Sequence, residues 1–262
     1  MTNRRAVVTG ASSGIGAATV RALRAAGWDV VGVARRAERL EALAAETGAA
    51  AFAADLTSDA DVDRLAVHLA ETGPLHALVH VAGGAKGTDR VEDGSVADWT
   101  WMYEVNVLSA QRLVARLLPQ LRRAAADGGT HADLLFVTST AAQVAYPGGG
   151  GYNAAKAGEA MLVHALRQEL NGEPLRVVEI APGMVHTEEF TLNRTGDPGA
   201  VDALYADVDH PLVAEDVADV IAYALGAPGH VNLDLVTMRP VAQAAQHLLH
   251  RGPLAVRGEA RA

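Results

Sequence analysis

The sequence predicts an α/β protein, a doubly wound sandwich with helices on both faces of a parallel sheet. Short apolar segments alternate with longer amphipathic segments along the chain, as in repeated strand–helix units. A glycine-rich turn at residues 10–16 joins the first apolar segment to a helical one. The chain has 262 residues, of which 50% are hydrophobic, so one large core is possible. With no internal boundary or repeat, we expect one domain over 1–262.

Composition excludes several classes of function. The chain contains no cysteine, so it has no disulfide framework, thiolate metal site or cysteine nucleophile. Its formal net charge of -9 argues against a general affinity for nucleic acid or anionic membranes. The N-terminal residues lead directly into a strand, and no uninterrupted apolar stretch has bilayer length. We therefore expect a cytoplasmic protein without a membrane partner.

The first strand–helix unit carries the glycine turn. Residues 6–9 form a predicted strand, and a helix is expected to run to about Ala26. A glycine turn at a helix N-terminus holds a pyrophosphate on backbone amides, although a turn with packing duties alone is the alternative. The glycine spacing here is G-x-x-x-G-x-G. The residues expected to bind a dinucleotide are Gly10, Ser12, Ser13, Gly14, Ile15 and Gly16.

The second strand, residues 29–34, predicts which dinucleotide is bound. In dinucleotide folds an acidic residue at the end of this strand accepts hydrogen bonds from the adenosine ribose. Here that position is Ala34, followed by Arg35 and Arg36. A guanidinium group binds a 2′-phosphate, which a carboxylate would repel. We therefore predict NADP rather than NAD.

Two further strand–helix units follow. The expected elements are a helix over 36–46, a strand over 50–54, a helix over 59–71 and a strand over 76–81. Asp55 ends the third strand and suits a hydrogen bond to the adenine amine, with a cap for the next helix as the alternative. Ala82-Gly83 follows the fourth strand.

The segment 99–121 is predicted to be one long helix that is apolar nearly all the way round. Such a helix must be covered on more than one side, which indicates a subunit interface. Asn106 is the polar exception within it. Residues 124–131 are polar and contain glycine, so we expect an exposed connection there.

The stretch from Ser139 to Lys156 carries the candidate chemistry. It follows a buried apolar strand over 134–137, and four glycines precede a helix that Tyr152 opens. Tyr152 and Lys156 share a helix face because they are four residues apart. An acid/base tyrosine near neutrality needs its pKa lowered by roughly 3 units, about 4 kcal/mol, and a lysine charge acts in that direction. The same spacing also occurs as an ordinary solvated pair.

The remaining elements complete the sheet. We expect a helix over 152–171, a strand over 175–180, a helix over 214–226, a last strand over 232–237 and a C-terminal tail over 240–262. Residues 188–211 lack strong periodicity and follow Pro182-Gly183 at the carboxyl edge of the sheet. Such a segment is a natural substrate lid.

With these elements placed, the chain resembles the short-chain dehydrogenase/reductase family over essentially its whole length. The matching residues are Thr9-Gly10-x-x-x-Gly14-Ile15-Gly16, Asp55-Leu56, Ala82-Gly83, Asn106, Ser139, Tyr152-x-x-x-Lys156 and Pro182-Gly183. The resemblance implies a Rossmann-type fold with a seven-stranded parallel sheet. It also implies a homotetramer or dimer that assembles through the helices 99–121 and 152–171.

The resemblance further implies a catalytic set of Asn106, Ser139, Tyr152 and Lys156. Tyr152 would exchange a proton with the substrate while hydride passes to or from the nicotinamide. Lys156 and the oxidised nicotinamide would lower the tyrosine's pKa, and Lys156 would also hold the ribose. Ser139 would bind the substrate oxygen, and Asn106 would hold a water that links Lys156 to solvent. The further implied NADP(H) ligands are Arg35, Arg36, Asp55, Leu56, Ala82, Gly83, Tyr152, Lys156, Pro182, Gly183, Val185 and Thr187.

One departure from the family pattern follows the fourth strand. The family usually has Asn-Asn-Ala-Gly, whereas this chain has His80-Val81-Ala82-Gly83. The change puts the hydrogen bonding near the adenosine half in question, not the catalytic step. We expect no metal site, because no second ligand stands at useful spacing from His80. His247 and His250 could share a helix face, but a solvated amphipathic end is the simpler interpretation.

Within the family, the chain is most similar to the NADP-dependent 3-hydroxy acid (serine) dehydrogenases. The residues that carry this likeness are Val33-Ala34-Arg35-Arg36-x-Glu38-Arg39-Leu40, the 146–149 region, Glu189-Phe190, Arg194, Asp216-Val217-Ala218 and Val231-Asn232. That branch oxidises the β-hydroxyl of small carboxylic acids. We expect Arg194 in the lid to bind the substrate carboxylate, with a solvated loop arginine as the alternative.

Two other functions stay open. One is the reduction of bulkier ketones in a secondary pathway, since the sequence pattern of the lid over 188–211 does not define the size of the substrate. The other is a regulator that senses NADP without turnover, although such a regulator would leave Ser139, Tyr152 and Lys156 unexplained. A methyltransferase on a similar fold would leave the same residues unexplained. Fold alone does not separate these functions.

Overall fold

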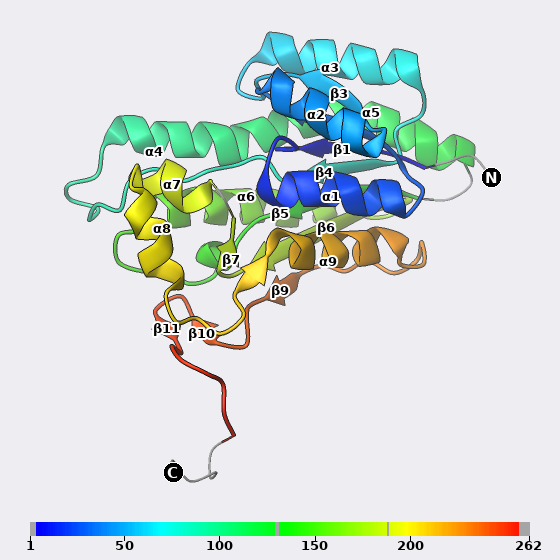
Figure 1. Cartoon of the computed structure of the whole chain (residues 1–262). Coiled ribbons are helices and arrows are strands. Elements are labelled where there is room, and N and C mark those ends of the chain that lie inside the picture. The colour runs from blue at the N-terminus through cyan, green and yellow to red at the C-terminus, as the bar shows by residue number, and fades with distance from the viewer. Residues whose placement is uncertain (1–3, 129–130, 188, 257–262) are drawn as a thin grey trace.

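The structure is a computed structural model that describes residues 4–128, 131–187 and 189–256. Its centre is a seven-stranded parallel sheet with the order β3-β2-β1-β4-β5-β6-β9 (Figure 1). The strands are β1 (Arg5–Thr9), β2 (Asp29–Ala34), β3 (Ala50–Ala53), β4 (Ala77–His80), β5 (Ala132–Val137), β6 (Leu175–Pro182) and β9 (Val236–Met238). Strand order reverses between β1 and β4, which is where doubly wound sheets bind ligands.

The central strands are apolar because helices cover them on both faces. Every residue of β1 and of β5 is buried, so neither strand shows the alternation of a half-exposed strand. β1 pairs with β2 from Arg5 opposite Asp29 through Thr9 opposite Val33. This register brings the ends of the two strands, and the loops that follow them, to the same edge of the sheet.

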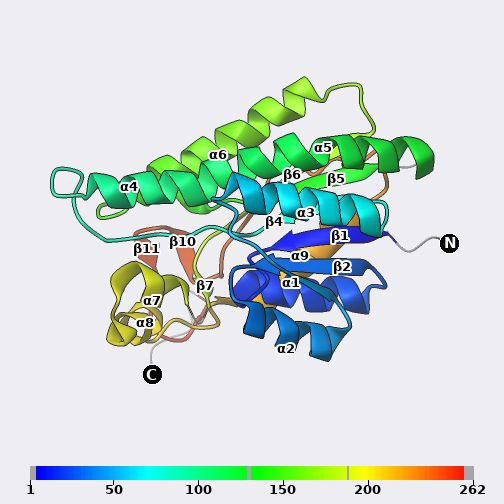
Figure 2. The ribbon, with the colours of Figure 1, turned by 90° about the horizontal axis from the view of Figure 1, so that it is seen from above.

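One face of the sheet is covered by α1 (Gly14–Ala25), α2 (Ala37–Thr47) and α9 (Ala214–Gly226), as Figure 2 shows. Leu23 of α1, Leu40 of α2 and Ile221 of α9 bury their side chains in this layer. Full burial of such a side chain contributes about 1.5–3 kcal/mol. The sequence predicted both ends of α2 and α9 to within about one residue, whereas α1 begins at Gly14, inside the predicted glycine turn.

The other face is covered by α3 (Asp59–Thr72), α5 (Ser109–Gly128) and α6 (Gly150–Glu169). The side chains buried in this second layer include Leu65 of α3, Leu117 of α5 and Val163 of α6, together with Phe136 of β5. No helix of the described residues combines the length and apolar character that crossing a bilayer requires.

The predicted single helix over 99–121 is three consecutive elements. α4 (Val96–Tyr103) continues through a π-helical turn, Glu104–Leu108, into α5. Asn106 lies inside the π turn and is fully buried. A π turn inserts one residue into the helical repeat and is often found at functional sites, where it redirects a side chain.

The prediction of an exposed connection over 124–131 is wrong for its first half. α5 continues to Gly128, and Ala124 and Ala125 are buried against the second layer. The two alanines lie on the same face of the helix as Leu121, and therefore extend its apolar stripe by one turn. Residues 129–130 lie outside the described part of the chain.

The predicted lid over 188–211 contains regular structure that its sequence pattern did not reveal. After β7 (Val185–His186) it forms α7 (Phe190–Thr195) and α8 (Pro198–Tyr205), and β8 (Leu212–Val213) closes the segment by pairing with β7. Asp197 caps α8 by accepting from the Gly199 amide at 2.8 Å. These helices are too short to show a clear period, and residue 188 lies outside the described part.

The last strand of the sheet begins later than predicted. Residues 232–235 are not strand, because the side chain of Asn232 occupies the edge of β6 instead. Its carboxamide accepts from the Val177 amide at 2.8 Å and donates to the Val177 carbonyl at 3.0 Å. β9 then pairs with the end of β6, from Val236 opposite Ile180.

The C-terminal tail over 240–262 includes a short hairpin of β10 (Gln243–Ala245) and β11 (Leu248–Leu249). The suggestion that His247 and His250 share a helix face is therefore wrong: His247 precedes β11 and His250 follows it. Residues 257–262 lie outside the described part.

Candidate active site

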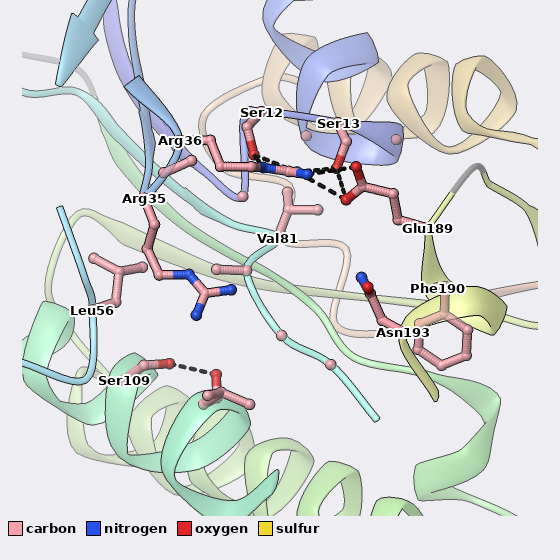
Figure 3. A pocket seen from close by; sticks show the side chains of 18 of the residues that line it. Ser12, Ser13, Arg35, Arg36, Leu56, Val81, Ser109, Glu189, Phe190 and Asn193 are labelled. Carbon is pink, nitrogen blue, oxygen red and sulfur yellow. Dashed lines mark hydrogen bonds and ion pairs between the residues drawn. The ribbon is translucent and has the colours of Figure 1, made fainter. Parts of the chain in front are cut away.

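A cavity of about 420 Å³ opens at the carboxyl edge of the sheet, where the strand order reverses (Figure 3). The loops after β1, β2, β3 and β4 form its walls, and α7 of the lid closes another side. This is the position at which doubly wound folds bind dinucleotides. The predicted residues that line it are Gly10, Ser12, Ser13, Gly14, Ile15, Gly16, Arg35, Arg36, Asp55, Leu56, Ala82, Gly83 and Thr187.

The glycine turn brings the backbone close to the cavity. Gly10 and Gly14 have φ of 66° and 49°, a conformation that side chains disfavour. A Cβ at Gly16 would lie 2.2 Å from the Gly10 carbonyl oxygen, so no larger residue fits there. The first turn of α1 therefore faces the cavity with its amides accessible to an anion.

The two arginines after β2 have different surroundings. The side chain of Arg35 points into the cavity (Figure 3). Arg36 donates to Ser12 Oγ at 2.8 Å and to both carboxylate oxygens of Glu189, at 2.5 and 2.8 Å. Arg39 donates to the same carboxylate at 2.6 Å.

Glu189 connects the lid to the glycine turn. Its carboxylate also accepts a hydrogen bond from Ser13 Oγ at 3.0 Å. The hydrogen bonds from Arg36 hold the pKa of Glu189 below its usual range, with Ser13 and Arg39 acting in the same direction. The sequence analysis quoted Glu189 as a branch feature but assigned it no contact, because no spacing rule joins residues so far apart in the chain.

Asp55 lines the cavity, but it does not cap the following helix. Ser58 provides that cap, since its hydroxyl accepts from the Asp61 amide at 3.3 Å. The Asp55 carboxylate instead accepts from the amide and the hydroxyl of Thr57, at 3.0 and 2.8 Å. This local turn fixes the carboxylate at the wall of the cavity.

His80, the departure from the family pattern, is fully buried beneath the cavity. Thr9 Oγ1 accepts from the amides of Val81 and Ala82 and lies 3.0 Å from His80 Nδ1. The threonine hydroxyl therefore donates to a neutral imidazole. Burial, together with the charge of Lys156, lowers the pKa of His80 to about 3. Through Thr9, His80 holds the start of the loop after β4 in place, and it does not line the cavity.

Tyr152 and Lys156 lie on the buried face of α6. Their exposed fractions are 8% and 4%. Burial raises the pKa of Tyr152 above its ordinary value, although the charge of Lys156 and a hydrogen bond with Ser139 act in the opposite direction. The lowering expected from the lysine is therefore present but smaller than the effect of burial. Lys156 Nζ donates to Glu159 at 2.7 Å and to the Val137 carbonyl at 3.1 Å.

The four expected catalytic residues are brought together around Gly83 and the end of β5. Asn106 donates to the carbonyls of Gly84 and Met102, at 2.9 and 2.7 Å, and accepts from the Gly84 amide at 3.1 Å. A Cβ at Gly83 would lie 2.5 Å from Asn106 Oδ1 and 3.2 Å from Lys156 Nζ. Glycine at this position therefore lets the loop after β4 pass between the two side chains.

Of the four residues expected after β6, Thr187 alone lines the described cavity. Thr187 contacts the glycine turn, 3.4 Å from where a Cβ of Gly14 would lie. Pro182 ends β6, the Gly183 amide donates to the Met238 carbonyl at 2.7 Å, and Val185 packs against the first core layer. These three hold the start of the lid in place.

Arg194, the expected carboxylate ligand, holds the lid to two loops. Its guanidinium donates to the carbonyls of Gly87 and Gly148, at 3.1 and 2.7 Å, and to the hydroxyl of Tyr146 at 3.0 Å. The Arg194 carbonyl also accepts from the Gly87 amide at 3.0 Å. The Arg194 guanidinium therefore has three acceptors in the protein and is not a solvated loop arginine.

A second, smaller cavity adjoins Tyr152. This hollow has a volume of about 10 Å³, which is room for about one water molecule. Tyr152, Lys86 and Arg194 line it together with Asp89 and Asp98, and Lys86 lines the large cavity as well. Lys86 Nζ lies 4.7 Å from the centre of the Trp101 ring and 3.5 Å from Asp98 Oδ1. Phe190 of α7 packs edge-on against Tyr152, with ring centres 5.4 Å apart, and it is Phe190 that lines the large cavity. Sequence reasoning missed Lys86 and gave Phe190 no contact.

The residues that line the large cavity fit NADP(H). Within the described ranges, no group of three or more histidine, cysteine or acidic side chains is placed to hold a metal ion. The glycine turn supplies a cradle that a Cβ at Gly16 would fill, and Arg35 supplies a cation inside the cavity. A parallel sheet with this cavity at its switch point defines a Rossmann-type nucleotide-binding fold.

Comparison with known proteins defines the family. The sequence profile of the short chain dehydrogenases matches residues 4–197, and the chain belongs to this family. An oxidoreductase of Mycobacterium tuberculosis is 48% identical over 92% of this chain and 93% of that protein. Serine 3-dehydrogenase of Agrobacterium fabrum is 38% identical over 90% of this chain and 94% of that protein.

Two further relatives bear on the cofactor and the substrate. Sulfoacetaldehyde reductase 2 of Chromohalobacter salexigens is 36% identical, and the match covers 91% of this chain and 94% of that protein. The closed form of a serine dehydrogenase complexed with NADP+ superimposes with a TM-score of 0.87 at 31% identity, over 94% of this chain and 99% of that chain. The protein is an NADP-dependent short-chain dehydrogenase/reductase, as the sequence predicted.

Proposed function

We propose that the protein interconverts the β-hydroxyl and the carbonyl group of a small organic acid such as serine or another 3-hydroxy acid. One observation carries the proposal: Tyr152 lines a small hollow together with two cations, Lys86 and Arg194, and two carboxylates, Asp89 and Asp98. Lys86 and Arg194 supply the positive charge that suits a substrate whose reacting oxygen lies close to an anionic group.

The chemistry is divided among four side chains. Tyr152 exchanges a proton with the substrate oxygen, and Ser139 positions that oxygen. Lys156 stabilises the Tyr152 phenolate through its charge. Asn106 fixes the loop after β4 against α4 through its bonds to Gly84 and Met102. When bound, NADP(H) accepts or supplies the hydride.

The names of the relatives support an acidic substrate. Serine, 3-hydroxy acids and sulfoacetaldehyde each carry a carboxylate or sulfonate close to the carbon that is oxidised or reduced. The shared requirement is a positive charge near the acid/base tyrosine. Lys86 and Arg194 meet this requirement in this chain.

We assign the two cations different roles. Arg194 contributes charge and holds the lid closed, since its donors are bound to Gly87, Gly148 and Tyr146. Lys86 is the direct ligand of the substrate anion, because it lines both cavities and its exposed pair with Asp98, at 3.5 Å, is weak. The sequence predicted Arg194 as the ligand of the substrate carboxylate, and we now propose Lys86 as its direct ligand, with Arg194 in support.

The cofactor is assigned to the large cavity. Arg35 binds the 2′-phosphate, the amides of the glycine turn bind the pyrophosphate, and Asp55 faces the adenine. Lys156 holds the nicotinamide ribose, and Thr187 contacts the nicotinamide end. The other proposed cofactor contacts are Ser12, Ser13, Ile15, Arg36, Leu56, Ala82, Gly83, Tyr152, Pro182, Gly183 and Val185.

We further propose a cytoplasmic homotetramer, or a dimer, that assembles through α4, α5 and α6. Tyr103 of α4 and Met161 of α6 support this arrangement, since both are large apolar side chains exposed on the face of these helices, by 47% and 65%. Equilibrium sedimentation of the protein gives the number of subunits, and a monomer at micromolar concentration would contradict this assembly.

The test of the substrate class compares charged and neutral substrates in wild type and in Lys86→Ala. NADPH formation is followed with serine, a series of 3-hydroxy acids and the corresponding neutral alcohols. We expect the acids to be preferred, and Lys86→Ala to raise their KM by roughly tenfold or more with little change for the alcohols. The control is Glu92→Ala, which removes an exposed charge elsewhere on the same loop between β4 and α4.

Two outcomes would contradict the proposal. Turnover of bulky neutral ketones with no turnover of acids would keep the chemistry and reject the substrate class. Tight NADPH binding with no turnover of any substrate would favour a regulator that senses NADP. An unchanged KM for acids in Lys86→Ala would remove Lys86 from the site, and the same measurement on Arg194→Ala tests the second cation.

A further inference from the structure

A buried carboxyl group lies beside Lys156 that the proposed mechanism does not use. Glu159 stands on α6, one turn after Lys156, and none of its surface is exposed. Its Oε2 accepts from Lys156 Nζ at 2.7 Å. Burying a carboxylate is costly unless charge and hydrogen bonds compensate it, so such a residue calls for an explanation.

The surroundings of Glu159 compensate its charge only in part. Its second oxygen, Oε1, is buried without a hydrogen-bond partner among the described residues. Burial raises the pKa of Glu159 to about 7; the charge of Lys156 opposes this rise, and the charge of Glu179 adds to it. The carboxyl group therefore changes its protonation state near neutral pH.

Lys156 has two hydrogen-bond acceptors, and only one of them takes up protons. Val137 offers a backbone carbonyl at 3.1 Å, and Glu159 offers a carboxylate at 2.7 Å. The carboxamide of Asn106 is bound to the backbone of Gly84 and Met102, so its protons are held elsewhere. Glu159 is thus the acid/base group in direct contact with Lys156.

A second carboxylate acts on this pair through its charge and contacts a partly exposed histidine. Glu179 of β6 accepts from Thr138 Oγ1 at 2.7 Å, and His164 Nε2 lies 3.0 Å from its other oxygen. The side chain of His164 is 41% exposed. Glu179 raises the pKa of both Glu159 and Lys156, so its charge acts on the buried pair.

Other titratable groups on the elements packed against α6 are placed differently. Tyr103 of α4 is 47% exposed, and Glu104 in the π turn forms an ion pair of its own. His80 of β4 stays neutral at neutral pH, because burial lowers its pKa to about 3. Tyr152, on α6 itself, is the group that Lys156 serves.

We propose that Glu159 is a positioning residue of the acid/base unit, which takes up and returns the proton that Lys156 exchanges with Tyr152. This inference rests on the proposed roles of Tyr152 and Lys156. In the direction of reduction, Tyr152 gives its proton to the carbonyl oxygen as hydride adds to the carbon. The phenolate takes a proton from the Lys156 ammonium, Lys156 takes one from the Glu159 carboxyl, and solvent returns it through Glu179 and His164. Oxidation runs the same transfers in reverse.

The same arrangement fixes the sign of a measurable effect. A negative Glu159 offsets part of the positive charge that Tyr152 experiences, and it raises the pKa of Tyr152. Glu159→Gln keeps the shape and removes the charge, which leaves the Lys156 ammonium unopposed. The Tyr152 phenolate should then form at lower pH.

The first experiment titrates Tyr152 by phenolate absorbance in protein saturated with NADP+, and subtracts the same titration of Tyr152→Phe. We expect Glu159→Gln to move the titration of Tyr152 down by roughly one pH unit. Glu169→Gln, the same change at an exposed position on the same helix, should leave it within about 0.2 unit. An unchanged or upward-shifted titration in Glu159→Gln would overturn the proposal.

The second experiment follows the proton in a single turnover. A pH indicator reports proton release while absorbance reports NADPH formation. We expect the two to coincide in wild type, and proton release to lag roughly tenfold in Glu159→Gln. Proton release that still coincides with NADPH formation in this variant would overturn the transfer.

A third variant covers the case in which Glu159→Gln does not fold. His164→Gln changes a half-exposed side chain and should fold normally. We expect it to delay proton release a few fold without moving the titration of Tyr152. Coincident release in His164→Gln would overturn the route to solvent. The titration needs no substrate, so a failure of the proposed function, seen as absent wild-type turnover, is distinguishable from a failure of this inference.

Discussion

Lowering the pH should destabilise this protein through His80, a residue that the family pattern does not contain. His80 is fully buried, and burial lowers its pKa to about 3 from an ordinary value near 6.5. A histidine whose pKa is lower in the folded state contributes stability that is present above about pH 6.5 and is lost as the pH falls toward 3. The unfolded chain binds the proton, and the folded chain does not.

The magnitude follows from the two pKa values. At about pH 5, protonation of His80 stabilises the unfolded state by roughly 2 kcal/mol relative to the folded state. At about pH 7.5 this stabilisation is close to zero. His80→Asn restores the family's residue type and removes the titration. Its amide oxygen can accept the hydrogen bond that Thr9 now donates to the imidazole.

The assay is urea unfolding of wild type and His80→Asn at both pH values. We expect the loss of unfolding free energy between about pH 7.5 and 5 to be smaller by roughly 2 kcal/mol in the variant. Other groups contribute equally to both proteins, including His76 and His131, whose pKa values burial also lowers. Glu159 acts in the opposite direction in both, because its raised pKa favours the folded state as the pH falls. An identical pH dependence in the two proteins would refute the reasoning.

Two further substitutions test the cofactor cavity and its floor. Arg35→Asp places a carboxylate where the 2′-phosphate is expected, so the ratio of kcat/KM for NADP to that for NAD should fall by at least about tenfold; an unchanged ratio would remove Arg35 from the phosphate site. Gly83→Ala would place a methyl group 2.5 Å from Asn106 Oδ1 and 3.2 Å from Lys156 Nζ. We expect it to lower the unfolding free energy by about 1–3 kcal/mol and to reduce kcat, and full activity with an unchanged Tm would contradict the packing described here.

Much of the fold was predictable because local patterns and the tertiary environment agree. The strands of the sheet are continuous apolar runs, since helices cover both faces, and helix ends carry ordinary signals such as Gly48 after α2. The predictions failed where a side-chain contact or a local distortion interrupts a regular element. Asn232 bonds to Val177 in place of a strand, and the π turn at Asn106 interrupts a helix whose sequence shows no break.

The candidate site was predictable where contacts are local or belong to a family motif. Tyr152 and Lys156 are one helical turn apart, and the glycine turn stands between a strand and a helix. The contacts of Glu189 with Arg36, and the position of Lys86 beside Tyr152, join segments far apart in the chain. Spacing rules describe single elements, so contacts of this kind become visible only when the fold brings the segments together.

The most direct test of the central claim is NADP reduction by purified protein offered serine and a series of 3-hydroxy acids, with Tyr152→Phe in parallel. We predict NADPH formation by wild type, a loss of at least about a hundredfold in kcat for Tyr152→Phe, and nearly unchanged NADPH binding in the variant. Full activity of Tyr152→Phe would contradict the proposed mechanism.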